Sequence, residues 1–231
     1  MQDFHKFNAR LEKNFGIFSP AELSKITETR VLIVGLGGIG GYLANALVRL
    51  GVRQLTLVDF DKFKVTNLNR QLFSSLKTID KFKVDIIKDE LLKIDPTLKI
   101  DSRPLSIEAL DGDVVSKVDV VFDAVDVIKT KIYLEKMCSK YNLPLIHGAL
   151  GGWFGQVGIS LPKSSLLEDF YGQSVSGLED SMGAPTFIPP LVAHYMVVQF
   201  ILLCLGKKEA LINQILNIDA LQTELSVVYK K

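Results

Sequence analysis

The chain has 231 residues, of which 48% are hydrophobic, and its formal net charge is +1. This length allows one well-packed core with appendages, so we expect a single domain over residues 1–231. The near-neutral charge argues against a broad basic face for nucleic acid. Two cysteines, Cys138 and Cys204, are too few for a disulfide framework or a four-cysteine zinc site.

Neither targeting nor membrane insertion is indicated. Residues 1–15 contain no apolar core of a signal peptide. The longest apolar run, residues 191–205, includes His194, Tyr195 and Gln199, and is too short and too polar to span a bilayer. This run predicts a buried helix, and a reducing, cytoplasmic location is the expectation.

Residues 1–29 predict a helical extension ahead of the main fold. Ser19 followed by Pro20 and Glu22 is typical of a helix start, with serine as the cap and proline at the first position. Arg10 is the one cation of this segment that we single out. On local sequence alone, the better interpretation of Arg10 is a solvated helix charge.

The stretch from Arg30 to Asp61 carries the strongest signal. A short apolar run over 31–34 predicts a strand buried on both faces. A G-x-G-x-x-G turn follows, then helical spacing over 41–50 with Gly51 as its cap, and a second strand over 55–58 that ends at Asp59. Strand, glycine turn, helix, strand and acid form the nucleotide-binding βαβ pattern; the turn glycines are Gly35, Gly37, Gly38 and Gly40.

The segment after Asp59 is dense in groups that bind sugar and phosphate: Asp61, Asn67, Arg70 and Gln71. Open α/β sheets place their ligands at this end of the strands. Residues 79–94 predict an amphipathic helix with Asp80 as its cap. Lys83 falls in the first turn, where the helix dipole disfavours a cation, so it is either an exposed lysine or one held for an anion.

The remaining elements predict the fold class. We expect strands over 98–103, 118–124 and 145–148, helices over 107–110 and 127–141, an antiparallel strand over 156–159, and a closing hairpin over 215–219 and 225–229. The class is α/β, a Rossmann-like, mostly parallel sheet with helices on both faces and antiparallel carboxyl-terminal strands. Residues 162–188 show no period, and a loop of this length is predicted to be a mobile lid.

Two carboxylates, Asp123 and Asp126, follow the central strand of this sheet. Carboxylates beside a phosphate site repel it unless a hard cation lies between them. The pair therefore implies Mg²⁺.

Five features carry a family resemblance: the Gly35–Gly40 turn, Asp59 to Asp61, the Asn67…Arg70-Gln71 set, Lys83, and the run from Asp123 to Asp126. Together they closely resemble the ThiF/MoeB/HesA family. That family is related to the adenylating domain of ubiquitin-activating enzymes. The resemblance runs from about Arg10 to the carboxyl terminus and includes Gly155-Gln156-Val157.

The resemblance implies an adenylyltransferase that uses ATP and Mg²⁺. Its acceptor would be the carboxyl-terminal glycine of a β-grasp, ubiquitin-like sulfur carrier ending in Gly-Gly, with release of pyrophosphate. It assigns Asp59 to the ribose, Asn67, Arg70 and Lys83 to the phosphates, and Asp126 to Mg²⁺. Arg10 matches an arginine that reaches the partner's ATP in a homodimer, although its spacing to the glycine turn differs by a residue.

Three departures from the family pattern qualify these expectations. The four zinc-binding cysteines of many members are absent, so no zinc is expected. Residues 155–190 contain no cysteine, which argues for adenylation without a covalent carrier–enzyme step or for a partner that supplies sulfur. Val127 replaces the usual asparagine after Asp126, which weakens the metal assignment.

Two alternatives stay open. One is ATP-dependent activation of a modified nucleoside in tRNA, which the near-neutral charge disfavours. The other is an NAD-dependent Rossmann oxidoreductase, for which the sequence offers no good hydride-site acid or base.

Overall fold

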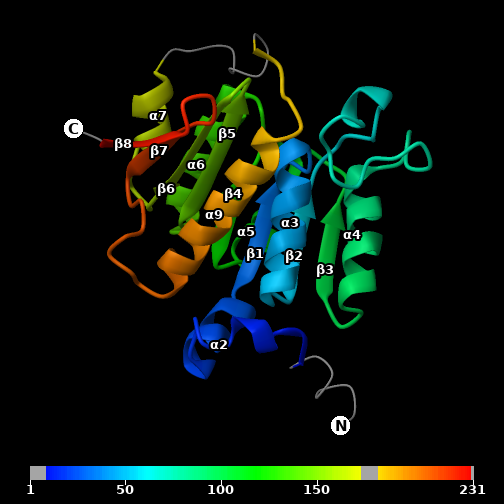
Figure 1. The fold of residues 1–231 in the computed structure, drawn as a ribbon, viewed down its shortest axis with the longest axis horizontal. Helices are drawn as coiled ribbons and strands as arrows, with labels where there is room; N and C mark the ends of the chain where they lie inside the picture. Colours follow the sequence, from blue (N-terminus) through cyan, green and yellow to red (C-terminus); the bar gives the residue numbers. More distant parts are fainter. Residues whose placement is uncertain (1–8, 173–181, 230–231) are drawn as a thin grey trace.

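A computed structural model of the chain describes residues 9–172 and 182–229 (Figure 1). The strands form one eight-stranded sheet in the order β3-β2-β1-β4-β5-β6-β7-β8. The first five in sequence are parallel and the last three antiparallel, which confirms the predicted fold class. Their bounds are β1 Arg30–Val34, β2 Gln54–Val58, β3 Lys99–Arg103, β4 Val120–Asp123, β5 Leu145–Gly151, β6 Phe154–Ser160, β7 Gln214–Asp219 and β8 Glu224–Tyr229.

Helices cover both faces of the sheet (Figure 1). One face carries α3 (Gly38–Leu50), α4 (Lys83–Ile94) and α9 (Ile188–Cys204). The other carries α5 (Gly112–Val115), α6 (Ile128–Tyr141) and α7 (Leu166–Tyr171). Helix α2 (Pro20–Glu28) lies below the sheet, and short 3₁₀ turns occur at η1 (Glu12–Asn14), η2 (Val65–Asn67) and η3 (Ile107–Ala109).

The first strand shows why its sequence is continuously apolar. Val31 and Ile33 point into the core under α3 and α9, whereas Leu32 and Val34 point into the core under α6. All four are buried. Because both faces are covered, none of these four positions carries a polar residue.

The helix caps that the sequence predicted at Ser19 and Gly51 are present in the structure. Ser19 and Glu22 form a reciprocal capping box with Pro20 at the first helical position of α2. Gly51 ends α3 in the left-handed region at φ 118°. Residues 1–8 of the predicted extension lie outside the described residues.

The helix predicted over 79–94 begins later than expected. Asp80 is not its cap, because Asp80 has φ 63° and donates its backbone N–H to Phe63 O. Residues 79–82 are instead tied to the preceding loop through Lys62 and Phe63, so the helix starts at Lys83. A tertiary contact overrides the local signal here.

Part of the predicted loop over 162–188 is helical. Helix α7 was not predicted, since its first turn is capped by Glu135 of α6 and not by a neighbouring side chain. Residues 173–181 of the loop lie outside the described part, and the idea of a mobile lid stays a prediction. Within the described residues no helix combines the length and apolarity needed to cross a bilayer.

Candidate active site

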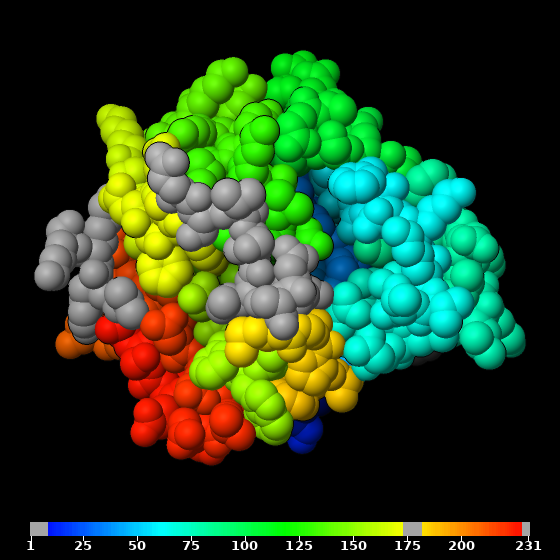
Figure 2. All heavy atoms as spheres, turned by 90° about the horizontal axis from the view of Figure 1, so that it is seen from above, coloured from blue at the N-terminus to red at the C-terminus, as the bar shows by residue number. Residues whose placement is uncertain are grey.

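A cavity of about 540 Å³ opens at the carboxyl ends of β1, β2 and β4. Seen from above, it is a hollow between the cyan and green parts of the chain, with the blue atoms of the first strand and glycine turn at its floor (Figure 2). This volume is ordinary for a small-molecule site. The cavity lies where the connections that follow the neighbouring strands β1 and β4 run in opposite directions along the sheet. Open α/β sheets bind their ligands at such a point.

Two glycines of the turn are required by the fold itself. Gly35 has φ 87°, and a Cβ there would lie 2.6 Å from Ala124 O. A Cβ on Gly40 would collide with the carbonyl oxygen of Gly35. These two positions explain how β1 turns so tightly into α3.

Gly37 is different, because the protein leaves space there. Its Cβ would meet nothing closer than Gln71 Nε2 at 3.6 Å, an ordinary contact. Gly37 is also the N-cap of α3, without a side-chain cap, and it lines the cavity beside Gly38. The first N–H groups of a 13-residue helix therefore face an open space that suits an anion.

Asp59 fixes this turn from the end of β2. Its Oδ2 accepts from Leu36 N at 2.6 Å and its Oδ1 from Asp61 N at 2.7 Å. Burial raises the pKa of Asp59, and Lys83 and the two N–H groups oppose that rise. Lone pairs remain on the carboxylate to accept from a ligand hydroxyl.

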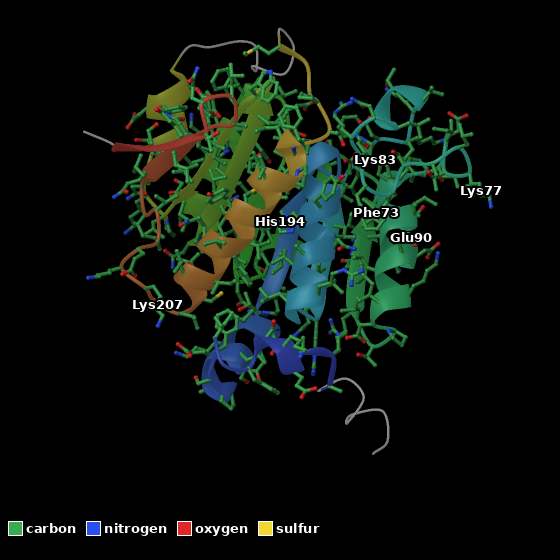
Figure 3. The ribbon with its side chains drawn as sticks, in the orientation of Figure 1. Phe73, Lys77, Lys83, Glu90, His194 and Lys207 are labelled. Carbon is green, nitrogen blue, oxygen red and sulfur yellow. The ribbon has the colours of Figure 1, made fainter. Side chains whose placement is uncertain are left out.

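Lys83 is a buried cation aimed at the cavity. It is the first residue of α4, at the same end of the molecule as the glycine turn (Figure 3). Its side chain is 6% exposed, with Nζ 3.0 Å from Asp61 Oδ2 and 3.9 Å from Asp59 Oδ2. Of the two interpretations of Lys83, the structure therefore excludes the exposed surface lysine.

The polar loop after Asp59 also lines the cavity, as predicted, through Asn67, Arg70 and Gln71. Asn67 Oδ1 accepts from Lys64 N, and Arg70 donates to Thr66 O and Asn69 Oδ1. Gln71 Oε1 is buried and has no hydrogen-bond partner within the described residues. An acceptor left unsatisfied beside Gly37 is costly unless a ligand or solvent donates to it.

The two carboxylates after β4 do not converge as the sequence suggested. Asp126 is exposed at the cavity, whereas Asp123 is 0% exposed and faces the interior. No cluster of three or more His, Cys, Asp or Glu side chains that could hold a metal occurs in the described ranges. Since Mg²⁺ is commonly held by one or two carboxylates together with substrate phosphates, Asp126 alone fits that role and Asp123 does not.

Asp123 belongs instead to a buried network that the sequence reasoning missed. It lies 3.2 Å from Lys131 Nζ and 2.6 Å from His147 Nδ1. His147 Nε2 lies 3.0 Å from the Tyr171 hydroxyl, which is 3.0 Å from Gln156 Oε1. The available signal was Lys131, a charge at a position of α6 whose helical neighbours Ile128 and Leu134 are buried.

Arg10 lies far from the cavity in its own chain. Its guanidinium donates to Val48 O and to Asp95 Oδ2, near the carboxyl ends of α3 and α4. The cavity is at the amino-terminal ends of these helices. The structure therefore brings together the other predicted site residues but not Arg10.

Both cysteines fall in helices, as predicted. Cys138 is buried in α6, and Cys204 is the last residue of α9. Burial raises the pKa of both thiols, which keeps them protonated. Neither thiol lines the cavity.

A family model described as the ThiF family matches residues 9–231. The chain belongs to this family. It is 33% identical over 151 residues to tRNA threonylcarbamoyladenosine dehydratase of Haemophilus influenzae, covering 63% of this chain and 57% of that protein. It is 34% identical over 140 residues to the sulfur carrier protein ThiS adenylyltransferase of Escherichia coli, covering 60% and 55%.

The chain thus spans about half the length of these curated relatives. Among solved structures, E. coli MccB with succinimide has a TM-score of 0.78 at 22% identity, covering 95% of this chain and 71% of that one. At that identity the likeness establishes the fold.

Proposed function

We propose that the cavity binds ATP with Mg²⁺ and transfers AMP to a carboxylate, releasing pyrophosphate. The observation that carries this proposal is Gly37. It caps α3 where the fold has room for a side chain, so the open space is explained by a ligand that approaches the backbone closely. The orphaned Gln71 oxygen beside it requires a ligand with a hydrogen-bond donor, such as a ribose hydroxyl, since phosphate oxygens only accept.

The other residues have roles that follow from their positions. Asp59, next to the turn, would accept from the ribose hydroxyls. Asn67, Arg70 and Lys83 would contact the phosphates, with Asp61 holding the Lys83 ammonium in position. Asp126 would contribute a carboxylate to Mg²⁺, which supplies charge neutralisation along the triphosphate.

The chemistry requires this kind of site. A carboxylate that attacks the α-phosphorus approaches a polyanion, so like charges must be neutralised and the two reactants held in line. Lys83 and Arg70 supply positive charge, and the amino-terminal end of α3 supplies oriented N–H groups. Removing one such group typically costs roughly 10²–10³ in rate.

For the acceptor we propose the carboxyl-terminal glycine of a small β-grasp carrier protein. Relatives named ThiS adenylyltransferase and molybdopterin-synthase adenylyltransferase support this choice. A modified nucleoside in tRNA is the second candidate, supported by the names of two relatives. An NAD-dependent reaction is the third, and it rests on the Rossmann-like sheet alone.

We further propose a homodimer in which Arg10 of each subunit reaches the other's site. An apolar stripe on α9 offers a surface for association, since Leu191 is 40% and Val198 45% exposed. His194 lies on the same outward side of the helix (Figure 3). Arg10 would have to leave Asp95 to act in this way.

Two glycine variants test nucleotide binding. Gly37→Ala should fold but lose the rise in melting temperature that ATP–Mg²⁺ produces, because its methyl group would occupy the space of a phosphate. Gly41→Ala is the matched control: its Cβ also has a nearest contact of 3.6 Å, but Gly41 does not line the cavity. If Gly37→Ala keeps the full ATP response, or if NAD stabilises the protein and ATP does not, the proposal fails.

A further inference from the structure

Helix α7 lines the cavity through Phe170 and Tyr171, and α6 supports it directly at its start and through side chains of β4 and β5 at its end. At its start, Glu135 of α6 accepts from Leu167 N at 2.9 Å and Glu168 N at 3.2 Å. These are donors that the first turn of a helix otherwise leaves unsatisfied. One helical turn before Glu135, Lys131 holds Asp123 and so the network that ends at Tyr171, the last residue of α7.

The protons of this network can be placed by elimination. Asp123 can only accept, and Lys131 and the backbone N–H of Val125 already donate to it. His147 Nδ1, at 2.6 Å, must therefore carry a proton. Burial and the Lys131 ammonium lower the pKa of His147, so the ring is neutral and Nε2 is an acceptor.

This assignment decides the direction of the next two hydrogen bonds. Tyr171 must donate its single proton to His147 Nε2, and burial raises its pKa, so that the phenol keeps the proton. The phenol oxygen can then only accept from Gln156. Rotation of the amide exchanges its oxygen and nitrogen positions, which places the NH₂ group against Tyr171 and leaves the carbonyl oxygen to accept from elsewhere.

Gln156 and Tyr171 line the side of the cavity away from the predicted nucleotide residues. The glycine turn, Asp59 and Lys83 lie at β1 and β2, whereas Gln156 is on β6, beyond β4 and β5 in the sheet order. If ATP occupies the first side, the second side receives the acceptor. This step rests on the proposed function.

We propose that Gln156 is a specificity-determining residue whose carbonyl oxygen accepts from the N–H of the acceptor's last peptide bond, and that His147 and Tyr171 are positioning residues that orient its amide. The site would then select a carboxylate carried on a secondary amide. It would disfavour a simple carboxylic acid, or a tail in which an ester replaces that amide, since an ester has no N–H to donate.

The orientation of the Gln156 amide is tested first, without an acceptor. In ¹⁵N-labelled enzyme, the imidazole of His147 should carry its proton on Nδ1 through neutral pH, and Tyr171→Phe should move the Nε2 resonance of that ring. A proton on Nε2 in the wild-type protein would reverse the Gln156 amide and overturn the proposal, whether or not adenylation occurs.

Specificity is tested by ATP–pyrophosphate exchange with a carrier ending in Gly-Gly and with the same carrier whose last peptide bond is an ester. The ester and Gln156→Leu should each lower kcat/KM for the carrier by about three- to tenfold, the range of one neutral hydrogen bond. Combined, they should lower it no further, and the KM for ATP should stay unchanged.

Gln214→Leu, on β7 outside the cavity lining, is the matched control and should leave both carriers unaffected. Additive effects of the ester and Gln156→Leu would overturn the specificity role. If wild-type enzyme exchanges with no carrier, the proposed acceptor is wrong, and the imidazole measurement alone decides the orientation.

Discussion

Replacing Lys131 with methionine should strongly destabilise the protein. The Lys131 side chain is 3% exposed and that of Asp123 is 0% exposed, with Nζ 3.2 Å from Oδ1. Nζ also donates to Gly148 O at 2.9 Å. Methionine fills similar space but leaves Asp123 as a buried charge without its cation.

The size of the effect follows from this burial. Breaking a buried ion pair by removing one partner costs about 3–5 kcal/mol. In a domain of this length, each kcal/mol shifts the melting temperature by roughly 2–4 °C. The melting temperature of Lys131→Met should therefore fall by about 6–20 °C at neutral pH, compared with wild type.

The loss of stability in Lys131→Met should depend on pH in a definite direction. Burial alone would raise the pKa of Asp123, but Lys131 and the hydrogen bond from His147 hold it below the ordinary value of 3.8. A lowered folded-state pKa contributes stability above 3.8 that is lost as pH falls through the folded-state value. The deficit of Lys131→Met should thus be fully present at neutral pH and shrink only as the pH falls below 3.8.

Thermal unfolding by circular dichroism measures both effects. Lys129→Met, an exposed position on the same helix, is the control and should change stability by less than about 0.5 kcal/mol. Adding Asp123→Asn to Lys131→Met should restore part of the loss, because the stranded charge is removed. Equal melting temperatures for the Lys131 and Lys129 variants would refute the reasoning.

Four further predictions concern the site and the assembly. Asp59→Ala should abolish the stabilisation by ATP, about 2.7 kcal/mol at a ligand concentration of 100 Kd, and an unchanged melting shift would count against the assignment. A Cys138→Ala/Cys204→Ala double variant should still adenylate its acceptor, and loss of activity in a folded variant would show a cysteine-dependent step. Arg10→Ala should lower the melting temperature, because it strands the buried Asp95. Mixing Arg10→Ala with Asp126→Ala under subunit exchange should restore roughly a quarter of the sites if Arg10 acts across a two-fold dimer. No recovery despite proven exchange would confine Arg10 to its own subunit.

The sequence was sufficient to predict those elements whose signal comes from residues close together in the chain. The apolar run of β1, the glycine turn, the Ser19 cap and the Gly51 cap each depend on residues within a few positions. The cavity side chains at β1 and β2 were also predictable, because parallel strands end at one edge of the sheet.

What the sequence did not reveal depends on contacts between distant segments. Asp123 was grouped with Asp126, but its side chain turns inward to Lys131 and His147, and only the packing of α6 and β5 determines that. Helix α7 is capped by Glu135, 32 residues away. The start of α4 is set by pairing with Phe63, which no helix-capping rule includes.

The position at which ATP is cleaved tests the central claim most directly. Wild-type enzyme, ATP, Mg²⁺ and a carrier ending in Gly-Gly should yield pyrophosphate and an AMP–carrier adduct, detected by ³¹P NMR and by the mass of the carrier. Lys83→Ala should lose this product, because the cavity then lacks the buried cation beside Asp59 and Asp61 that is proposed to contact the phosphates. Release of orthophosphate with ADP, and no AMP on any acceptor, would contradict the account.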